Sequence, residues 1–357
     1  MDMQVTPGDA IAARLLAWYD AHRRDLPWRR PPGMPGDPYR VWLSEIMLQQ
    51  TTVQVVRGYF DAFLERWPTV MDLVAAPMDD VLHAWAGLGY YARARNLHKC
   101  ARVVARELGG RFPDTEQELR QLPGIGRYTA AAVAVIAFDR RAVVVDGNVE
   151  RVMARQFRIA EPLPGAKPLF YERADALTPE HRPGDYAQAV MDLGATICTP
   201  RKPKCLLCPL SEHCRGRDVA EDLPRKNRKT DKPVRSGRAY WLARDDGAIL
   251  LRRRPDRGLL GGMMEVPGSG WTEKGAAEQP PPLEAEIWRE MPGLVRHTFT
   301  HFHLEVSVRA GKVAGWPAAP EDCIWCRVDR LGAQALPSVM RKIVTHALKG
   351  LTEETGP

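Results

Sequence analysis

The sequence lacks any apolar stretch long enough to cross a membrane. Its longest apolar run, residues 130–138, falls far short of the roughly 20 residues that a membrane-spanning helix needs. The opening residues, MDMQVTPGDA, contain neither a basic segment nor an apolar one, which argues against a secretory signal peptide. No internal repeat of the solenoid type is present either. We therefore expect a cytoplasmic protein, of bacterial type, with no membrane partner.

A disulfide framework is also excluded by this expectation, because a reducing compartment keeps thiols reduced. The seven cysteines then point to metal ligands or free thiols. Hydrophobic residues make up 45% of the chain and charged residues 27%, which is the balance of a globular protein with a buried core. Because single cores stop growing at roughly 250 to 300 residues, 357 residues predict two domains.

Positive charge is concentrated in one part of the chain. Residues 201–238 contain 12 Lys and Arg against 5 Asp and Glu, a surplus of seven that equals the net charge of the whole chain. Such a stretch suits a polyanion such as nucleic acid. Taken alone, it is equally compatible with a solvated linker.

The pattern of apolar residues changes near this basic stretch. Before it, helical spacing predicts helices at 11–19, 41–56, 81–88, 94–108, 128–138, 149–157 and 186–197. After it, strands are predicted at 239–243 and 248–252, joined by an Asp-Asp-Gly turn, and at 302–308 and 324–328, with a closing helix at 338–348. The sequence predicts an all-α domain followed by an α+β domain.

Four cysteines lie within 17 residues, at the end of the helical half. Cys198, Cys205, Cys208 and Cys214 are spaced Cys-X6-Cys-X2-Cys-X5-Cys. Thiolates this close can reach one metal centre, and the spacing alone leaves zinc and iron–sulfur open. Basic residues lie between the cysteines, so the metal would fold a loop that presents cations to phosphates.

Two further segments carry features of a DNA enzyme. In LPGIG, Gly124 and Gly126 permit a tight hairpin between two helices, and the free N–H groups of the second helix suit a phosphate. Asp146 follows the apolar run VVV near the start of another helix. Alone, the first segment is an ordinary helix-joining turn and the second an N-cap.

A third carboxyl lies on an apolar helix. Glu45 has Trp42, Leu43, Ile46 and Met47 around it in the sequence. A carboxyl held against apolar groups has its pKa raised and can carry a proton near neutrality. A lone Glu in a helix is more often solvated.

Together, the cysteine loop, the LPGIG hairpin and the VVVDGN run resemble the endonuclease III and MutY superfamily of helix-hairpin-helix DNA glycosylases. The run SEIMLQQT and residues 24–29, 87–91 and 188–194 are similar to the MutY-type adenine glycosylases in particular. The resemblance implies a 4Fe-4S cluster on the four cysteines. It also implies base excision repair, with hydrolysis of the N-glycosidic bond of adenine mispaired with 8-oxoguanine or guanine in double-stranded DNA.

The same resemblance implies roles for single residues. Glu45 would protonate adenine at N7 and Asp146, ionised, would stabilise the sugar cation. Assistance would come from Tyr128 and Asn148. The adenine pocket would be lined by Arg24, Trp28, Arg29 and Gln188. The DNA contacts would comprise Gln50, Thr51, Leu88 and Tyr90 near the damaged guanine, with Gly124 and Gly126 on the backbone.

One position departs from the strand-cutting members of the superfamily. They carry a lysine in the hairpin as a Schiff-base nucleophile, and here the matching residue is Tyr128. Without that amine no covalent imine forms. We expect a monofunctional enzyme, or at most a weak lyase through another lysine.

The second domain resembles the Nudix-like domain that MutY enzymes use to recognise 8-oxoguanine. Arg289 and Glu290 are followed by Met-Pro-Gly instead of further glutamates, so the metal-binding box of a Nudix hydrolase is absent. Phe299, Thr300 and His301 resemble the Phe-Ser-His loop at the lesion, with Thr in place of Ser.

These observations predict a glycosylase domain at 1–197, an iron–sulfur loop at 198–216, a basic linker at 217–237, a Nudix-like domain at 238–350 and a tail at 351–357. We expect a monomer, with repair partners at the linker. Two alternatives stay open: a glycosylase for another mismatched base such as thymine, and a non-catalytic iron–sulfur protein that binds DNA.

Overall fold

A computed structural model describes residues 7–227, 231–255, 257–275 and 279–352 of the chain. Parts of the expected basic linker and tail, residues 228–230 and 353–357, lie outside them. The chain divides into two compact units, Met1–Ala76 with Asn96–Lys229, and Pro77–Arg95 with Thr230–Pro357. Among the described residues, no helix combines the length and the apolar character that a membrane span requires.

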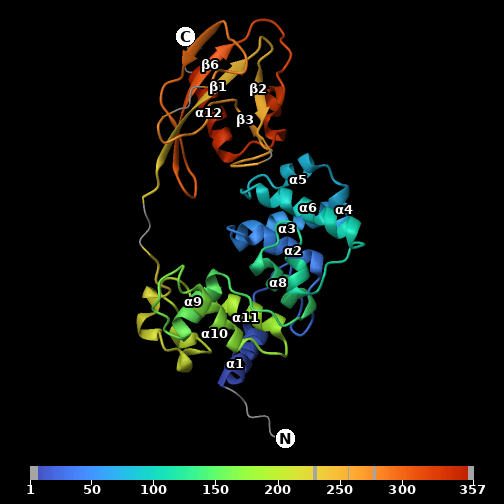
Figure 1. The fold of residues 1–357 in the computed structure, drawn as a ribbon, viewed down its shortest axis with the longest axis vertical. Coiled ribbons are helices and arrows are strands. Elements are labelled where there is room, and N and C mark those ends of the chain that lie inside the picture. The colour runs from blue at the N-terminus through green and yellow to red at the C-terminus, as the bar shows by residue number, and fades with distance from the viewer. Residues whose placement is uncertain (1–6, 228–230, 256, 276–278, 353–357) are drawn as a thin grey trace. The chain divides into compact units, whose positions relative to one another are not determined.

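The first unit is built from helices (Figure 1). They are α1 (Pro7–His22), α2 (Pro38–Leu48), α3 (Val53–Arg66), α4 (Val70–Ala75), α7 (Glu116–Leu119), α8 (Arg127–Phe138), α9 (Gly147–Gln156), α10 (Lys167–Leu177), α11 (Pro183–Thr196) and most of α6 (Ala92–Glu107). Helix α11 packs against α1, α8 and α9, and α2 packs against α8. Nearly every residue of α11 is buried, so its polar side chains face other helices.

The prediction of one continuous helix over residues 41–56 is wrong. Helix α2 ends at Leu48 and α3 begins at Val53, with Gln50 between them at a φ of 59°. This left-handed backbone cannot continue a right-handed helix. The break places Gln50 and Thr51 on a loop. Apolar residues on both sides of the break repeat at helical spacing, which is why the pattern hides it.

The second unit contains a mixed sheet and a helix that covers part of it (Figure 1). The strands are β1 (Val234–Ala243), β2 (Ala248–Arg253), β3 (Met264–Glu265), β4 (Ile287–Glu290), β5 (Val295–Thr298), β6 (His303–Lys312) and β7 (Cys323–Arg327). Their order is β3-β2-β1-β6-β4, with β5 on β6 and β7 on β2. The long strands β1 and β6 run parallel, from Val234 opposite His303 to Ala243 opposite Lys312.

Alternation explains β6, whose residues are buried at every second position along most of its length. The inward residues form a core with helix α12 (Ser338–Thr352), which contacts β5 and β6. The second unit also includes α5 (Met78–Ala84), from the helical half of the sequence. The predicted order, an all-α part followed by an α+β part, is confirmed.

Candidate active site

A cavity of about 910 Å³ opens in the first unit, within the size range of pockets that hold small ligands. Its wall comes from the segment after α1, from α2 and the loop behind it, from α8, from the start of α9 and from α11. The predicted residues on this wall are Arg24, Trp28, Arg29, Glu45, Gln50, Thr51, Tyr128, Asp146, Asn148 and Gln188. Residues more than 160 positions apart in the sequence thus meet at one site.

Glu45 is the buried acid of this cavity, with only 6% of its surface exposed. Burial raises its pKa to about 7, and the negative charge of Asp146 adds to the rise. The Tyr128 hydroxyl donates a hydrogen bond of 2.9 Å to Glu45 Oε2 and opposes it. The predicted increase in the pKa is confirmed, so a large share of Glu45 carries a proton at neutral pH.

Tyr128 occupies the first turn of α8, directly after the hairpin. Burial raises the pKa of Tyr128 well above its usual value, and the nearby carboxylates raise it further. The phenol therefore stays neutral and acts as a hydrogen-bond donor.

Asp146 caps the N-terminus of α9. Its Oδ1 accepts the backbone N–H groups of Asn148 and Val149 at 2.9 and 2.8 Å, and its Oδ2 accepts Asn148 Nδ2 at 2.9 Å. Asp146 also lines the cavity. The helix cap and a cavity-lining carboxyl group are therefore one residue, and three donors hold that group in place.

A chain of hydrogen bonds leads from this carboxylate toward the cysteines. Asn148 Oδ1 accepts Arg151 Nη2 at 2.8 Å, and Arg151 Nε donates to the carbonyl of Cys198 at 2.7 Å. Gly194 makes this approach possible, because a Cβ there would lie 2.6 Å from the Cβ of Asn148. A larger residue at Gly194 would push α9 away from α11.

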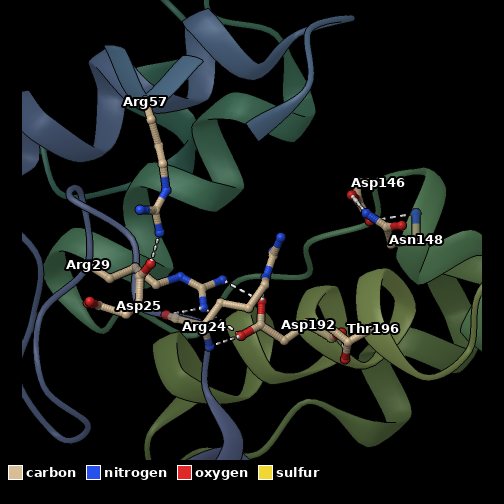
Figure 2. Close-up of polar contacts among 8 residues, drawn as sticks. All are labelled: Arg24, Asp25, Arg29, Arg57, Asp146, Asn148, Asp192 and Thr196. Atoms are coloured by element: carbon tan, nitrogen blue, oxygen red, sulfur yellow. Dashed lines mark hydrogen bonds and ion pairs between the residues drawn. The ribbon is translucent and has the colours of Figure 1, made fainter. Parts of the chain in front are cut away.

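Asp192, a fully buried carboxylate on α11, was not predicted from the sequence as a site residue. Its Oδ1 accepts Arg24 Nε at 2.6 Å and Arg29 Nη2 at 2.8 Å, and its Oδ2 accepts Arg29 Nη1 at 2.6 Å and the Arg24 N–H at 3.0 Å (Figure 2). Although burial opposes the charge, the bonds and charges of Arg29 and Arg24 hold the pKa of Asp192 below its ordinary value.

Asp192 also affects its main partner. Although burial lowers the pKa of Arg29, the bonds and charge of Asp192 raise it above its ordinary value. The signal for Asp192 was its spacing, four residues after Gln188, which places both side chains on one helix face.

The hairpin between α7 and α8 depends on one of its two glycines. Gly124 has a φ of 76°, and a Cβ there would lie 2.6 Å from Asn96 Cβ. Gly126 is extended, with φ −88° and ψ 177°, and a Cβ there would meet nothing within 4 Å. Only Gly124 therefore needs the conformational freedom of glycine here, while Gly126 is the N-cap of α8.

The four cysteines meet on a short loop after α11, all free thiols. Burial raises the pKa of Cys208 to about 11, and the other three cysteines raise it further through their charge. Four partly buried thiolates are therefore costly unless they bind cations, which is the chemistry of a metal–thiolate centre. The buried Arg155 donates to Cys198 Sγ at 3.3 Å and accepts a weak bond from Cys214 Sγ at its carbonyl.

A zinc ion and an iron–sulfur cluster require different distances between the four cysteine sulfur atoms. Four thiolates on one zinc would lie about 3.8 Å apart, because each Zn–S bond is about 2.3 Å. Among the residues that the structure describes, no three His, Cys, Asp or Glu are arranged to hold a single metal ion. In a 4Fe-4S cluster, by contrast, each of the four cysteines would ligate a different iron.

The remaining predicted residues belong to the second unit. Leu88 and Tyr90 lie on a loop after α5, held by bonds from Trp85 Nε1 to the Gly89 carbonyl and from Arg93 to the Leu88 carbonyl. Leu88 is buried, whereas half of the Tyr90 surface is exposed. The Tyr90 hydroxyl lies 2.8 Å from Thr300 Oγ1, within the same unit.

Phe299, Thr300 and His301 form the turn between β5 and β6. The Phe299 ring stacks on Phe302 at 4.7 Å, and the Phe299 N–H donates to the Phe302 carbonyl. Thr300 and His301 are exposed at the tip. An anchored aromatic ring therefore presents two exposed polar side chains.

Three family descriptions match the chain. Residues 43–172 match the HhH-GPD superfamily of base excision DNA repair proteins. Residues 198–214 match the iron–sulfur binding domain of endonuclease III, which confirms iron–sulfur over zinc. Residues 239–346 match the NUDIX domain, which confirms a Nudix-like second domain.

Named relatives match between two thirds and nearly all of this chain. An adenine DNA glycosylase of Homo sapiens is 36% identical over 94% of this chain and 73% of its own length. One from Mycolicibacterium smegmatis is 42% identical over 68% of this chain and 83% of its own length.

Solved structures resemble the helical part. A thermostable thymine-DNA glycosylase has a TM-score of 0.53 at 33% identity and covers 59% of this chain and 97% of its own. A non-covalent complex of endonuclease III with DNA has a TM-score of 0.50 at 23% identity, over 60% of this chain and 96% of its own, which indicates a shared fold.

Proposed function

The chain belongs to the adenine DNA glycosylase family of base excision repair, and from that premise we propose which of its residues release adenine and which read the opposing base. The observation that carries the proposal is the meeting of a protonated carboxyl and a fixed carboxylate in one cavity. Glu45 supplies the first and Asp146 the second.

The first step is proton donation. Glu45 gives its proton to N7 of the flipped adenine, which turns the base into a better leaving group. The Tyr128 hydroxyl, through its bond to Glu45 Oε2, holds the acid in position and stabilises the carboxylate that remains. Because its pKa lies near the working pH, a large share of Glu45 is protonated before the reaction, and the proton can still be transferred to adenine easily.

The second step is cleavage of the N-glycosidic bond. As the bond breaks, positive charge develops on the sugar, and the Asp146 carboxylate stabilises it across the cavity. Three hydrogen bonds fix Asp146 before the substrate arrives, so no reorganisation is needed during the reaction. Water then adds to the sugar cation and passes its spare proton to the Glu45 carboxylate that the first step left, which yields an abasic site, with Asn148 assisting through Asp146.

The flipped adenine is held by a cavity wall that has both apolar and hydrogen-bonding side chains. Trp28 packs edge-on against Phe60 at 5.2 Å and offers an apolar surface. Arg24, Arg29 and Gln188 supply hydrogen-bonding groups on the same cavity wall. An extruded base needs both kinds of contact.

The reaction stops at the abasic site. Tyr128, at the hairpin position of the strand-cutting nucleophile, is a buried phenol and cannot form an imine. We propose a monofunctional glycosylase, in which borohydride traps little covalent adduct with DNA.

Backbone contacts fix the enzyme on double-stranded DNA. The N–H groups at the start of α8, after Gly124 and Gly126, suit one phosphate, and the basic residues of the cysteine loop suit others. When bound, the 4Fe-4S cluster supplies the metal–thiolate bonds that fold this loop.

The opposing base is read by other residues. Gln50 and Thr51, on the loop between α2 and α3, and the exposed Tyr90 enter the duplex near the lesion, with Leu88 buried in the same loop as Tyr90. The turn Phe299–Thr300–His301 contacts 8-oxoguanine, and Tyr90 adjoins it within the second unit. We also propose a monomer, the domain limits given above, and repair partners at linker residues 217–237.

An oligonucleotide assay tests this function. Purified protein is incubated with duplexes that carry adenine opposite 8-oxoguanine, adenine opposite guanine, or thymine opposite guanine, and abasic sites are revealed by alkali. We expect excision of adenine from the first two and none of thymine. Excision of thymine alone would overturn the proposal in favour of a mismatch glycosylase for another base.

A further inference from the structure

Arg29 lies on the cavity wall together with Glu45, and it is bound by Asp192, a fully buried carboxylate that is not itself among the cavity-lining residues. Asp192 accepts both terminal nitrogens of Arg29, at 2.6 and 2.8 Å (Figure 2). The hydrogen bond that Glu45 accepts comes instead from Tyr128. Yet Arg29 and Glu45 line the same cavity and act on each other electrostatically.

The contact between Asp192 and Arg29 is unusually well fixed. Arg24 fills the two remaining acceptor positions of the carboxylate, with its Nε and its backbone N–H. The side chain of Asp192 is 0% exposed and that of Arg29 is 5% exposed. Away from water, charged and bidentate hydrogen bonds are strong and hold one geometry.

The charged and titratable groups that face Glu45 come from three elements. Tyr128 approaches from α8, Asp146 from the N-cap of α9, and Arg29 from the segment after α1. Arg29 favours ionised Glu45 by its charge, while Asp146 disfavours it. Helix α11 contributes the uncharged Gln188 to the cavity; of its two aspartates, Asp192 bonds Arg29 and Asp185 bonds Arg182.

We propose that Asp192 is a positioning residue that binds Arg29 in a bidentate ion pair and thereby keeps Glu45 protonated at neutral pH. This inference rests on the proposed role of Glu45 as the acid. The charge of an arginine released from Asp192 would act more strongly on Glu45, the cavity carboxyl with which Arg29 already interacts, and an opposite charge nearby favours the ionised form. An ionised Glu45 has no proton to donate.

The pH dependence of adenine excision under single-turnover conditions tests this inference. In Asp192→Asn, Arg29 is no longer neutralised, so the fall in rate at alkaline pH should begin about one pH unit lower than in the wild type. Arg29→Gln should move that fall to higher pH, because the cation itself is gone. The double variant should behave like Arg29→Gln, since Asp192 acts through Arg29.

Asp185→Asn is the matched control. Asp185 is also buried on α11, and its Oδ2 accepts Arg182 Nε at 2.8 Å and the Gly33 N–H at 2.7 Å. Its loss should lower the melting temperature as the loss of Asp192 does, and leave the pH midpoint of excision in place. A shift in both variants alike would overturn the inference, because general loosening would then explain it.

Failure of this inference can be separated from failure of the proposed function. If Glu45→Gln excises adenine at a near wild-type rate, Glu45 is not the acid and both fall. If Glu45→Gln is inactive while the midpoint of Asp192→Asn is unchanged, only the role of Asp192 falls. Should Asp192→Asn not fold, Arg29→Gln decides alone, and an unshifted midpoint in that variant overturns the inference.

Discussion

The cavity of the first unit and the exposed turn of the second unit are built in opposite ways. In the cavity, Glu45 and Asp146 are held by protein hydrogen bonds before any substrate binds. At the turn, Thr300 and His301 are exposed, and only Phe299 is anchored by packing. Chemistry requires preorganised groups away from water, whereas a residue that reads DNA must have bonds left to offer. Substitutions should therefore cost far more in the cavity than at the turn.

Glu45→Gln should have the largest effect. Glutamine keeps the shape and a bond to Tyr128 but cannot donate the proton, so single-turnover excision should fall by about a thousandfold or more. Duplex affinity, measured by gel shift, should change little, because the proton is used mainly in the transition state. Glu65→Gln, an exposed position on α3, is the control and should behave like the wild type. A rate within a few-fold of wild type for Glu45→Gln would reject its role.

Asp146→Asn should come next, with a loss of about a hundred- to a thousandfold in single-turnover rate. Asparagine caps a helix as well as aspartate does, so the melting temperature should stay nearly constant. This separates the two roles of Asp146, as cap and as charge. A large drop in melting temperature together with the rate would instead assign the loss to folding.

Substitutions in the cysteine loop should have effects between these extremes, because in the proposed function the loop contacts DNA phosphates and not the reacting atoms. Purified protein should contain about four irons and four sulfides per chain. Cys205→Ala should lose the metal and solubility, and weaken duplex binding by about tenfold or more. Cys323→Ala, on β7, should retain all the iron. One zinc and no sulfide in the wild type would contradict this expectation.

The pH dependence of the excision rate is a finer test of the cavity, because it reports the pKa of Glu45. With a pKa of about 7, Glu45 is mostly protonated below neutrality and loses its proton as the pH rises. The single-turnover rate should therefore fall about tenfold per pH unit above the midpoint. The small residual rate of Glu45→Gln should lack this alkaline fall. A midpoint near the ordinary value for glutamate would show that the acid is not desolvated during the reaction.

A property of the site could be predicted from the sequence where the residues that cause it are close neighbours in the chain. Trp42, Leu43, Ile46 and Met47 surround Glu45 in the sequence of one helix, so the rise in its pKa could be predicted. Asp192 could not be identified in this way. Its burial depends on Arg24 and Arg29, more than 160 residues away, and no local pattern records that encounter.

Breaks in helices and short strands were the other features that could not be predicted from the sequence. The break after Leu48 and the positive φ of Gln50 interrupt a stretch that repeats at helical spacing throughout. Short strands such as β4 and β5 exist because they pair with β6, and four residues are too few for alternation to stand out. The long, strongly periodic elements α8, α11 and β6 were predicted within a few residues.

The smallest effect is expected at the turn. Thr300→Ala combined with His301→Ala should narrow the ratio of excision rates opposite 8-oxoguanine and guanine, with each lost contact worth roughly 1 to 3 kcal/mol. Excision opposite guanine should hardly change, because flipping and protonation use the other unit. Thr298→Ala, two residues earlier on β5, is the control and should keep the ratio.

A truncation near Leu223 is the harsher version of this test, and the structure shows how to interpret it. Arg155, which is buried, donates a hydrogen bond from its Nε to the Leu223 carbonyl, and the Asn227 N–H donates one to the Leu163 carbonyl. To keep both bonds, the chain should be cut after Asn227. Residues 77–95 belong to the second unit, so the truncated chain would keep these residues but lose the rest of that unit, against which they pack. The truncated chain should still excise adenine but lose its preference for 8-oxoguanine. If the point variants and the truncation both lower the rates opposite the two bases equally, the turn does not read the lesion, and the second unit only stabilises the first.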